Sequence, residues 1–338
     1  MKSPLSLLLI ANVVFFLEAP PAQKQERAVR QAGTSVEKQG LAKERKQGIE
    51  RGLIYFSTDD GATWTNHSKG LPKALHLSDM AASEAWLGVT TQEHGLFLYD
   101  FRRHVWQPTP TLPETKHKLD ALAFYHDSFF VGTQGSGVFL STDEGQSWKP
   151  YNQGLSNLTI RRFTEIDHQL FVGTNEGLYV LDAAKHEWRA VYRTPHLQVN
   201  GITALDGEFY IGTNQGAFKS DQHRKQWQPI MADRALHNIS TDGHTLYALA
   251  YNELFTSDDQ GLTWISAQKG LPDGLYTFQV KRSHQAVLAG QWDGVYKRSA
   301  VTGWTPSSRG MPLRFPVTEL IVHQNLVVAS SSSWSPHE

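Results

Sequence analysis

From Gly52 onward, short apolar runs alternate with clusters of Gly, Asn, Asp and Pro. Apolar runs bounded by turn residues predict many short β-strands, and helical periodicity is scarcely present in this part of the chain. A tryptophan closes each unit, and successive tryptophans stand 37 to 42 residues apart. A repeat of about 40 residues with strand content is typical of propeller blades. The tryptophans of this repeat are Trp64, Trp106, Trp148, Trp188, Trp227, Trp264 and Trp304.

Each unit predicts four antiparallel strands, as the unit around Trp227 illustrates. Residues 202–205 form its inner strand, and Asp206-Gly207 is a hairpin turn sequence. The second strand covers 209–213, the third covers 217–220, and the fourth begins at Trp227. Four antiparallel strands of this kind make one blade.

The two ends of the chain predict how the ring closes. The first unit begins at its third strand, 53–56, and the last unit ends after two inner strands, 317–322 and 326–329. Joined, these halves complete a seventh blade. The sequence therefore predicts an all-β, seven-bladed β-propeller of four-stranded antiparallel blades, with Velcro closure between its N- and C-terminal strands. Closure removes an exposed sheet edge, so loss of residues 317–330 should destabilise the whole ring.

An octet of the form Ser-x-Asp-x-Gly-x-Ser/Thr-Trp occurs three times, between a third and a fourth strand. Its Asp can accept hydrogen bonds from turn amides, its Gly permits positive φ, and its Trp is large enough to wedge between blades. We interpret these octets as structural turns and not as carboxylate or metal sites. Their defining residues are Ser57, Asp59, Gly61, Trp64, Ser141, Asp143, Gly145, Trp148, Ser257, Asp259, Gly261 and Trp264.

The octets resemble the Asp-box, or BNR, repeat of sialidase-like β-propellers. In layout, an export signal followed by one seven-bladed ring, the chain is similar to the photosystem II assembly and stability factor family. The resemblance covers 52–338 and implies that the Asp boxes lie at the blade periphery, on the face opposite the ligand site. It does not extend to that family's basic partner-binding patch. The sialidase Arg-Ile-Pro motif has only Arg314-Phe315-Pro316 as its nearest match, at the wrong end of the chain.

The first 51 residues differ from the rest. Residues 1–22 have the pattern of a signal peptide, with Lys2, an apolar run and small residues before Ala22. Residues 23–51 are polar and basic and are expected to be a disordered linker. We therefore expect an exported protein, periplasmic or secreted. Membrane association is expected only through an uncleaved signal or through the basic linker.

The composition limits which ligands and metal sites the chain can have. The formal net charge is −1, which gives no support for nucleic-acid binding. The chain has no Cys, so disulfides and thiolate metal sites are excluded. Its 15 His include no His-Glu-x-x-His motif. We expect no metal, no cofactor and a monomer.

A ligand site is expected around the central channel, where the loops between second and third strands converge. Aromatic, acidic and amide side chains there suit a protein or glycan partner. We favour a non-catalytic binding or assembly scaffold and assign no catalytic residue. The alternative is a glycoside hydrolase, sialidase-like or xyloglucanase-like, whose activity would depend on Glu176, Glu253 or Asp293. The candidate binding residues are Glu93, His94, Glu176, Asn214, Tyr251, Glu253, Trp292 and Asp293.

Overall fold

The computed structural model describes residues 52–332, apart from 73–74, 111, 113–117 and 276. These residues belong to one compact unit, Ile49–Glu338. The expected signal peptide, 1–22, and the expected linker, 23–51, lie outside the described residues. No helix within the described part of the chain is long and apolar enough to cross a membrane.

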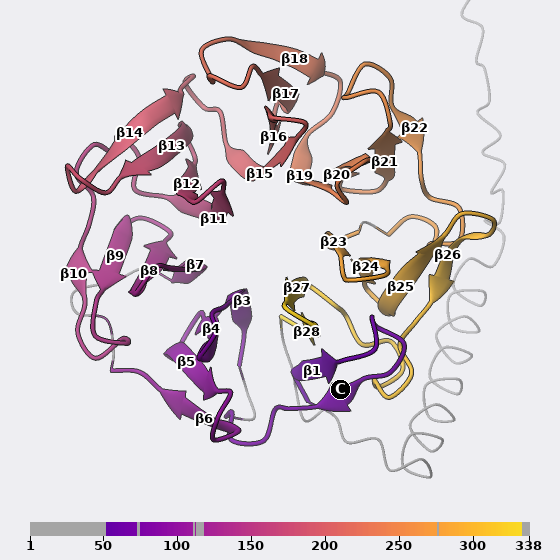
Figure 1. Cartoon of the computed structure of the whole chain (residues 1–338), viewed down its shortest axis with the longest axis horizontal. Coiled ribbons are helices and arrows are strands. Elements are labelled where there is room, and N and C mark those ends of the chain that lie inside the picture. Colours follow the sequence, from indigo (N-terminus) through magenta and orange to yellow (C-terminus); the bar gives the residue numbers. More distant parts are fainter. Residues whose placement is uncertain (1–51, 73–74, 111, 113–117, 276, 333–338) are drawn as a thin grey trace, which may run out of the picture. The chain divides into compact units, whose positions relative to one another are not determined.

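Within the described residues, 28 strands form seven four-stranded antiparallel sheets, which stand around a central axis as the blades of a propeller (Figure 1). The predicted fold class is confirmed. Three consecutive blades, each given from its inner to its outer strand, are β3 (Leu77–Ala82), β4 (Trp86–Thr91), β5 (Gly95–Asp100) and β6 (Val105–Pro108); β7 (Leu119–Tyr125), β8 (Ser128–Thr133), β9 (Val138–Ser141) and β10 (Lys149–Pro150); and β11 (Ile160–Ile166), β12 (Gln169–Thr174), β13 (Gly177–Asp182) and β14 (Glu187–Tyr192). The next three blades are β15 (Val199–Leu205), β16 (Glu208–Thr213), β17 (Gly216–Ser220) and β18 (Trp227–Met231); β19 (Leu236–Thr241), β20 (Leu246–Ala250), β21 (Leu254–Ser257) and β22 (Ile265–Ser266); and β23 (Gln279–Arg282), β24 (Val287–Gln291), β25 (Gly294–Ser299) and β26 (Gly303–Pro306).

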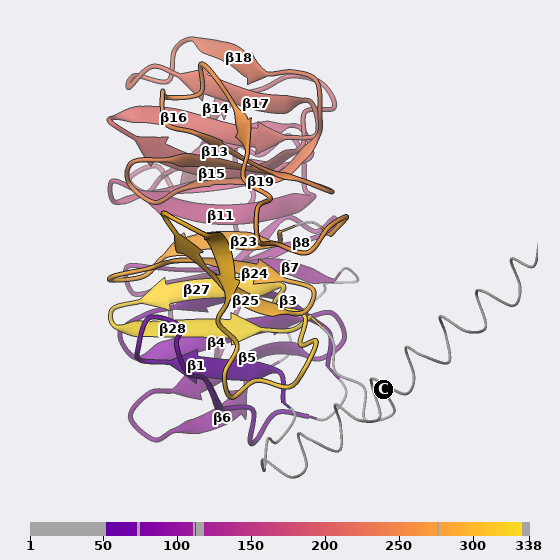
Figure 2. The same ribbon diagram turned by 90° about the vertical axis from the view of Figure 1, so that its right-hand side faces the viewer.

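The closing blade is shared by the two ends of the propeller. Its inner strands are β27 (Glu319–His323) and β28 (Leu326–Ser330), and its outer strands are β1 (Ile54–Ser57) and β2 (Thr65–Asn66). β1 pairs with β28 in antiparallel register from Ile54↔Ser330 to Ser57↔Val327. The indigo β1 and the yellow β28 lie side by side in Figure 2, as the predicted closure requires.

Strand order fixes which turns share a face. Successive strands of a blade are antiparallel, so the turns between first and second strands lie on the same face as those between third and fourth strands. We call this the 3–4 face, and it carries the Asp boxes that begin at Ser57, Ser141 and Ser257. The opposite face, formed by the turns between second and third strands, is the 2–3 face, and it carries all eight candidate binding residues.

The hairpin turn expected at Asp206-Gly207 has the backbone that its sequence favours. Asp206 has φ of 54° and Gly207 has φ of 80°. Two successive positive φ values are those of a type I′ turn, whose twist matches the strands that it joins. This turn connects β15 to β16 at the 3–4 face.

Each Asp box is a closed set of hydrogen bonds. In the second box, Asp143 Oδ1 accepts the amide of Ser147 at 2.9 Å and Asp143 Oδ2 accepts its hydroxyl at 2.5 Å. Ser141 Oγ donates to Asp143 Oδ1 and accepts the amide of Gly145, both at 2.8 Å. The boxes at Asp59 and Asp259 repeat these bonds. All of these carboxylate oxygens are used by their own turn.

The repeat tryptophans join neighbouring blades. Trp188 is 2% exposed, and its indole Nε1 donates to the carbonyl of Tyr151, next to the outer strand of the preceding blade, at 2.8 Å. Four other tryptophans donate in the same way to the preceding blade. Trp227 differs, because its Nε1 is buried without a partner among the described residues and its ring stacks on Tyr192. The four that resemble Trp188 are Trp64, Trp106, Trp264 and Trp304.

Candidate functional site

The inner strands place one equivalent residue of each blade at the channel. In five blades the inner strand has a bulge immediately before this position, between residues such as Leu77 and Asp79. The bulge changes which face of the strand the following side chains occupy. In all seven blades the residue pairs with the same position of the second strand, and we call the set the channel ring. Its members are Asp79, Ala121, Arg162, Gly201, Asn238, Gln279 and Glu319.

The polar members of the channel ring contact one another from blade to blade. Asn238 Nδ2 donates to Gln279 Oε1 at 3.0 Å, and Gln279 Nε2 donates to Glu319 Oε2 at 2.9 Å. Asp79 Oδ1 accepts the amide of Met80, and Asp79 Oδ2 accepts the amide of Leu122 from the next blade, each at 2.9 Å. These bonds link the inner strands β19, β23 and β27 to one another and, separately, β3 to β7.

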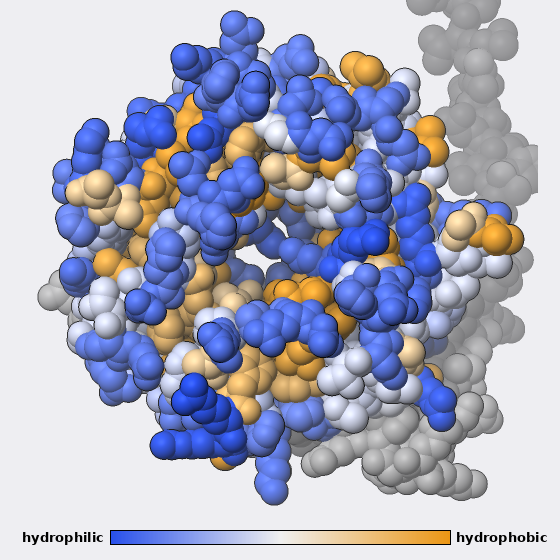
Figure 3. Space-filling model, viewed as in Figure 1, coloured by the Kyte–Doolittle hydropathy of each residue, from blue (hydrophilic) through white to orange (hydrophobic). Residues whose placement is uncertain are grey.

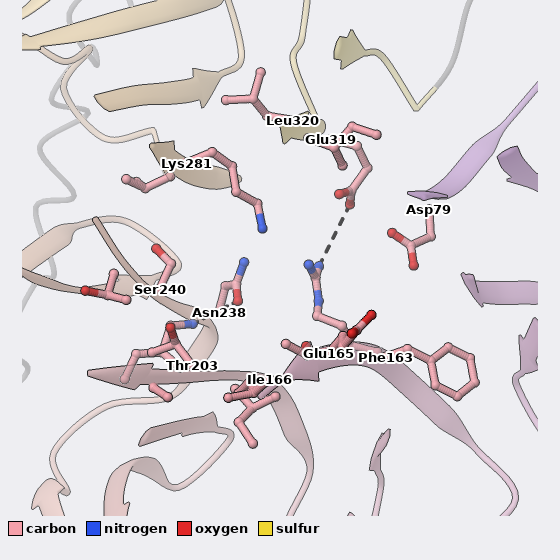
Figure 4. Close-up of a pocket in the computed structure, with 18 of the residues that line it drawn as sticks. Asp79, Phe163, Glu165, Ile166, Thr203, Asn238, Ser240, Lys281, Glu319 and Leu320 are labelled. Carbon is pink, nitrogen blue, oxygen red and sulfur yellow. Dashed lines mark hydrogen bonds and ion pairs between the residues drawn. The ribbon is translucent and has the colours of Figure 1, made fainter. Parts of the chain in front are cut away.

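Arg162 crosses the channel. It lies on β11, separated from the blade of β27 by two blades in one direction and three in the other. Its Nη2 nevertheless lies 3.9 Å from Glu319 Oε1, a contact drawn as the dashed line in Figure 4. Lys281, two residues after Gln279 on β23, points into the same space (Figure 4). Two cations and two carboxylates therefore meet inside the ring.

Burial shifts the titration of this cluster. Desolvation raises the pKa of the carboxyls of Asp79 and Glu319, although Arg162 opposes the shift in both. Desolvation lowers the pKa of Lys281, and Arg162 adds to that effect. Outside the cluster, burial lowers the pKa of His237, beside Tyr251, to about 4. Shifted titrating groups beside a cavity are a feature of binding and catalytic sites.

The cluster lines a cavity of about 490 Å³. Its wall runs from the channel ring along the inner strands to Asp167 and Thr241, at the 3–4 face. Figure 3 shows the opening at the centre of the ring. None of the eight candidate binding residues lines this cavity.

The eight candidate residues lie in five turns of the 2–3 face and make mostly local contacts. Glu93 lies 3.2 Å from the Nδ1 atom of His76, and the amide of its neighbour His94 donates to Thr91. Asn214 Oδ1 accepts the amide of Gln198 at 2.9 Å. Glu176 lines a separate hollow of about 400 Å³. These residues form no single constellation.

The remaining candidates lie on turns of two neighbouring blades. Tyr251 is 56% exposed and has the ring of His237 at 5.6 Å, while Trp292 is 41% exposed and packs edge-on against Phe278 at 4.8 Å. Glu253 Oε2 lies 3.5 Å from Arg234. In the second of these blades, Asp293 Oδ2 accepts the hydroxyl of Tyr296 at 2.9 Å.

The channel ring is absent from the expected site residues, although the sequence holds a signal for it. Aligning the repeats on their inner strands places a polar residue two positions after an apolar one in several units, as in Leu77-Ser78-Asp79 and Val317-Thr318-Glu319. A charge that recurs at one register of an otherwise apolar inner strand marks a position that faces the channel. Within the described residues no group of three or more His, Asp or Glu is arranged to hold a metal ion.

The fold defines the class of protein as a seven-bladed β-propeller. No protein-family model matches the chain, and no curated protein matches its sequence. Solved structures that resemble it include YCF48, a photosystem II assembly factor, bound to D1 peptide, with a TM-score of 0.60, 14% identity and coverage of 77% of this chain and 93% of that one. YCF48 from Cyanidioschyzon merolae has a TM-score of 0.59, 12% identity and coverage of 77% and 96%.

The chain also resembles the extracellular domain of the hybrid two component system BT3049 from B. thetaiotaomicron. The TM-score is 0.59 at 15% identity, over 83% of this chain and 42% of that domain, so this chain spans less than half of its length. At these identities the similarity shows the fold alone. Propellers of the photosystem II assembly factor YCF48 are thus among the structural neighbours of this chain, and they share its predicted fold.

Proposed function

We propose that this propeller is an exported, non-catalytic scaffold that binds a protein or glycan partner through its 2–3 face. The observation that carries the proposal is the pair Tyr251 and Trp292, on turns of adjacent blades, with exposed fractions of 56% and 41%. Exposed Tyr and Trp side chains offer large apolar area with a polar edge and are frequent energetic centres of interfaces. The ring of His237 contacts Tyr251, and the ring of Phe278 contacts Trp292.

The neighbours add support of a general kind. One is a propeller with a bound peptide, and another is an extracellular domain. Membership of the BNR repeat family, export through residues 1–22 and a monomeric state belong to the same proposal. Each rests on the sequence pattern.

The placement of the three acids favours binding over glycoside hydrolysis. A glycosidase needs two carboxyl groups about 5–10 Å apart that flank one scissile bond. Here Glu253 faces Arg234, Asp293 accepts a bond from Tyr296, and Glu176 lines a hollow that the other two do not line. The scaffold is therefore the reading that the geometry supports best.

The test compares two matched double variants on a glycan array and on a displayed random-peptide library. Tyr251→Ala with Trp292→Ala removes the aromatic pair, and Leu262→Ala with Val301→Ala removes two side chains of the 3–4 face that are 80% and 83% exposed. We expect the first variant to lose the ligands that the wild type selects and the second to keep them. Equal binding by both variants, or sugar release that Glu176→Gln, Glu253→Gln or Asp293→Asn abolishes, would contradict the proposal.

A further inference from the structure

The central cavity holds hydrogen-bond donors that the protein leaves unused. The carboxylates of its channel ring are already bonded, Asp79 by two backbone amides and Glu319 by Gln279. By contrast, Lys281 Nζ makes no hydrogen bond or ion pair with any residue of the described part of the chain. Among the residues that the structure describes, the one ion pair of Arg162 is the 3.9 Å contact with Glu319, which is longer than a hydrogen bond. The cations therefore keep most of their donor capacity for something else.

Ser240 is a second group in the cavity whose hydrogen-bonding capacity the protein leaves unused. It lies on β19, the inner strand next to that of Lys281, and it lines the cavity. Its side chain is 9% exposed, and its hydroxyl has no partner among the described residues. A buried polar group without a partner destabilises the protein, and a ligand that supplies an acceptor removes that cost.

We infer that this cavity binds a small organic carboxylate, held by Lys281, Arg162 and Ser240. A carboxylate presents only acceptors and forms short, charge-assisted bonds with ammonium and guanidinium groups. An inorganic ion would leave most of the cavity empty, because 490 Å³ lies within the range of about 300–1,000 Å³ typical of small-molecule sites. The inference concerns the channel and does not depend on the 2–3 face.

The other acids of the cavity lie away from these cations. Glu165 and Asp167 follow Arg162 on β11, at the end of the cavity near the 3–4 face. At about 3.3 Å per residue, the Cα atoms of Glu165 and Asp167 lie roughly 10 Å and roughly 16 Å from that of Arg162 along the strand. The negative charges at the mouth of the cavity are therefore separated from the donors at the channel ring, where the carboxylate would bind.

Three small molecules with the same number of carbon atoms differ in the charged groups that they carry. Comparing their binding tests whether the cavity selects carboxylates. Succinate carries two carboxylates, 4-aminobutanoate carries one carboxylate and one ammonium, and 1,4-diaminobutane carries two ammonium groups. We expect isothermal titration calorimetry at low ionic strength to give saturable binding of both carboxylate probes and no binding of the diamine. If neither carboxylate binds at millimolar concentration, or if the diamine binds as well as they do, the inference is wrong.

Variants then place the site. Lys281→Met keeps the length of the side chain and removes its charge, and we expect it to weaken binding at least about tenfold, as loss of a charge-assisted bond does. Lys149→Met, at an exposed lysine of the outer strand β10, is the matched control and should leave binding unchanged. Ser240→Ala removes a hydroxyl without a protein partner, so it should fold normally and still weaken binding.

Three outcomes of these titrations decide whether the carboxylate binds in the central cavity. Wild-type affinity in both Lys281→Met and Ser240→Ala would overturn the inference, because the ligand would then lie elsewhere. Loss of binding in the Tyr251→Ala, Trp292→Ala double variant would also overturn it, because it would place the carboxylate on the 2–3 face. Weakened binding in the two channel variants together with unchanged binding in the aromatic variant would support it, whatever the fate of the scaffold proposal.

Discussion

Asp143 shows what a single residue contributes to this fold. The hydroxyl and then the amide of Ser147 hold its carboxylate in the charged form, which lowers its pKa from 3.8 to about 2. Asp59 and Asp259 have the same shift from the equivalent Thr63 and Thr263. The unfolded chain takes up the proton at the higher pH, so this stabilisation is complete above about pH 4 and is lost as the pH falls toward 2.

We therefore expect Asp143→Asn to lower the urea midpoint of unfolding at pH 7, and the deficit to shrink steadily between pH 4 and pH 2. Urea titrations at pH 7, 4, 3 and 2 measure this. Asp127→Asn, at an exposed aspartate of the turn between β7 and β8, is the control and should show no such convergence. A deficit that stays constant down to pH 2 would mean that the charge of Asp143 does not hold the turn.

At the scale of the element, the tryptophans decide how firmly one blade holds the next. In Trp188→Phe the carbonyl of Tyr151 loses its donor, so we expect a loss of unfolding free energy of about 1–3 kcal/mol beyond the effect of the smaller ring. Trp227→Phe is the matched comparison, because its indole N–H has no partner among the described residues. Urea unfolding should therefore show a smaller loss for Trp227→Phe. A loss as large as that of Trp188→Phe would assign the stabilisation to ring size alone.

The same scale shows what the sequence could predict and what it could not. Turn residues such as Asp206-Gly207 and the repeated Phe-Val-Gly-Thr segments predict strands close to those observed, because local turn geometry determines them. In five blades the position of the channel-ring residue depends on a bulge at the start of the inner strand. A single extra residue such as Ser78 reverses which later side chains face the channel, and strand periodicity alone does not reveal it.

Contacts across the ring are a second feature that the local sequence pattern does not predict. Arg162 and Glu319 meet only because seven blades close, and 157 residues separate them in the chain. The exposed aromatics of the 2–3 face were within reach of sequence reasoning, since each sits in a turn of known position. The donors of the cavity were not, because whether Lys281 has a partner depends on side chains from other blades.

At the scale of the whole molecule, stability depends on the closing sheet. Four residue pairs join β1 to β28, and the side chains around them, including Tyr55, Leu320 and Val327, form one buried cluster. Removing residues 317–338 deletes β27 and β28, exposes the edge of β1 and the sheet faces of the neighbouring blades, and takes Glu319 from the channel ring. Because each blade packs on the next, we expect all seven to lose stability and not the closing blade alone.

Hydrogen exchange and thermal unfolding show whether all seven blades lose stability or only the closing blade does. We expect the truncated chain to unfold at a much lower temperature than the intact chain, and the amides of β15 to β18, far from the cut, to lose protection together with those of β3 to β6. Removing only 333–338 is the control and should change neither measurement, because β28 ends at Ser330. Full protection of β15 to β18 in the truncated chain would mean that the blades are stable independently and that closure does not hold the ring together.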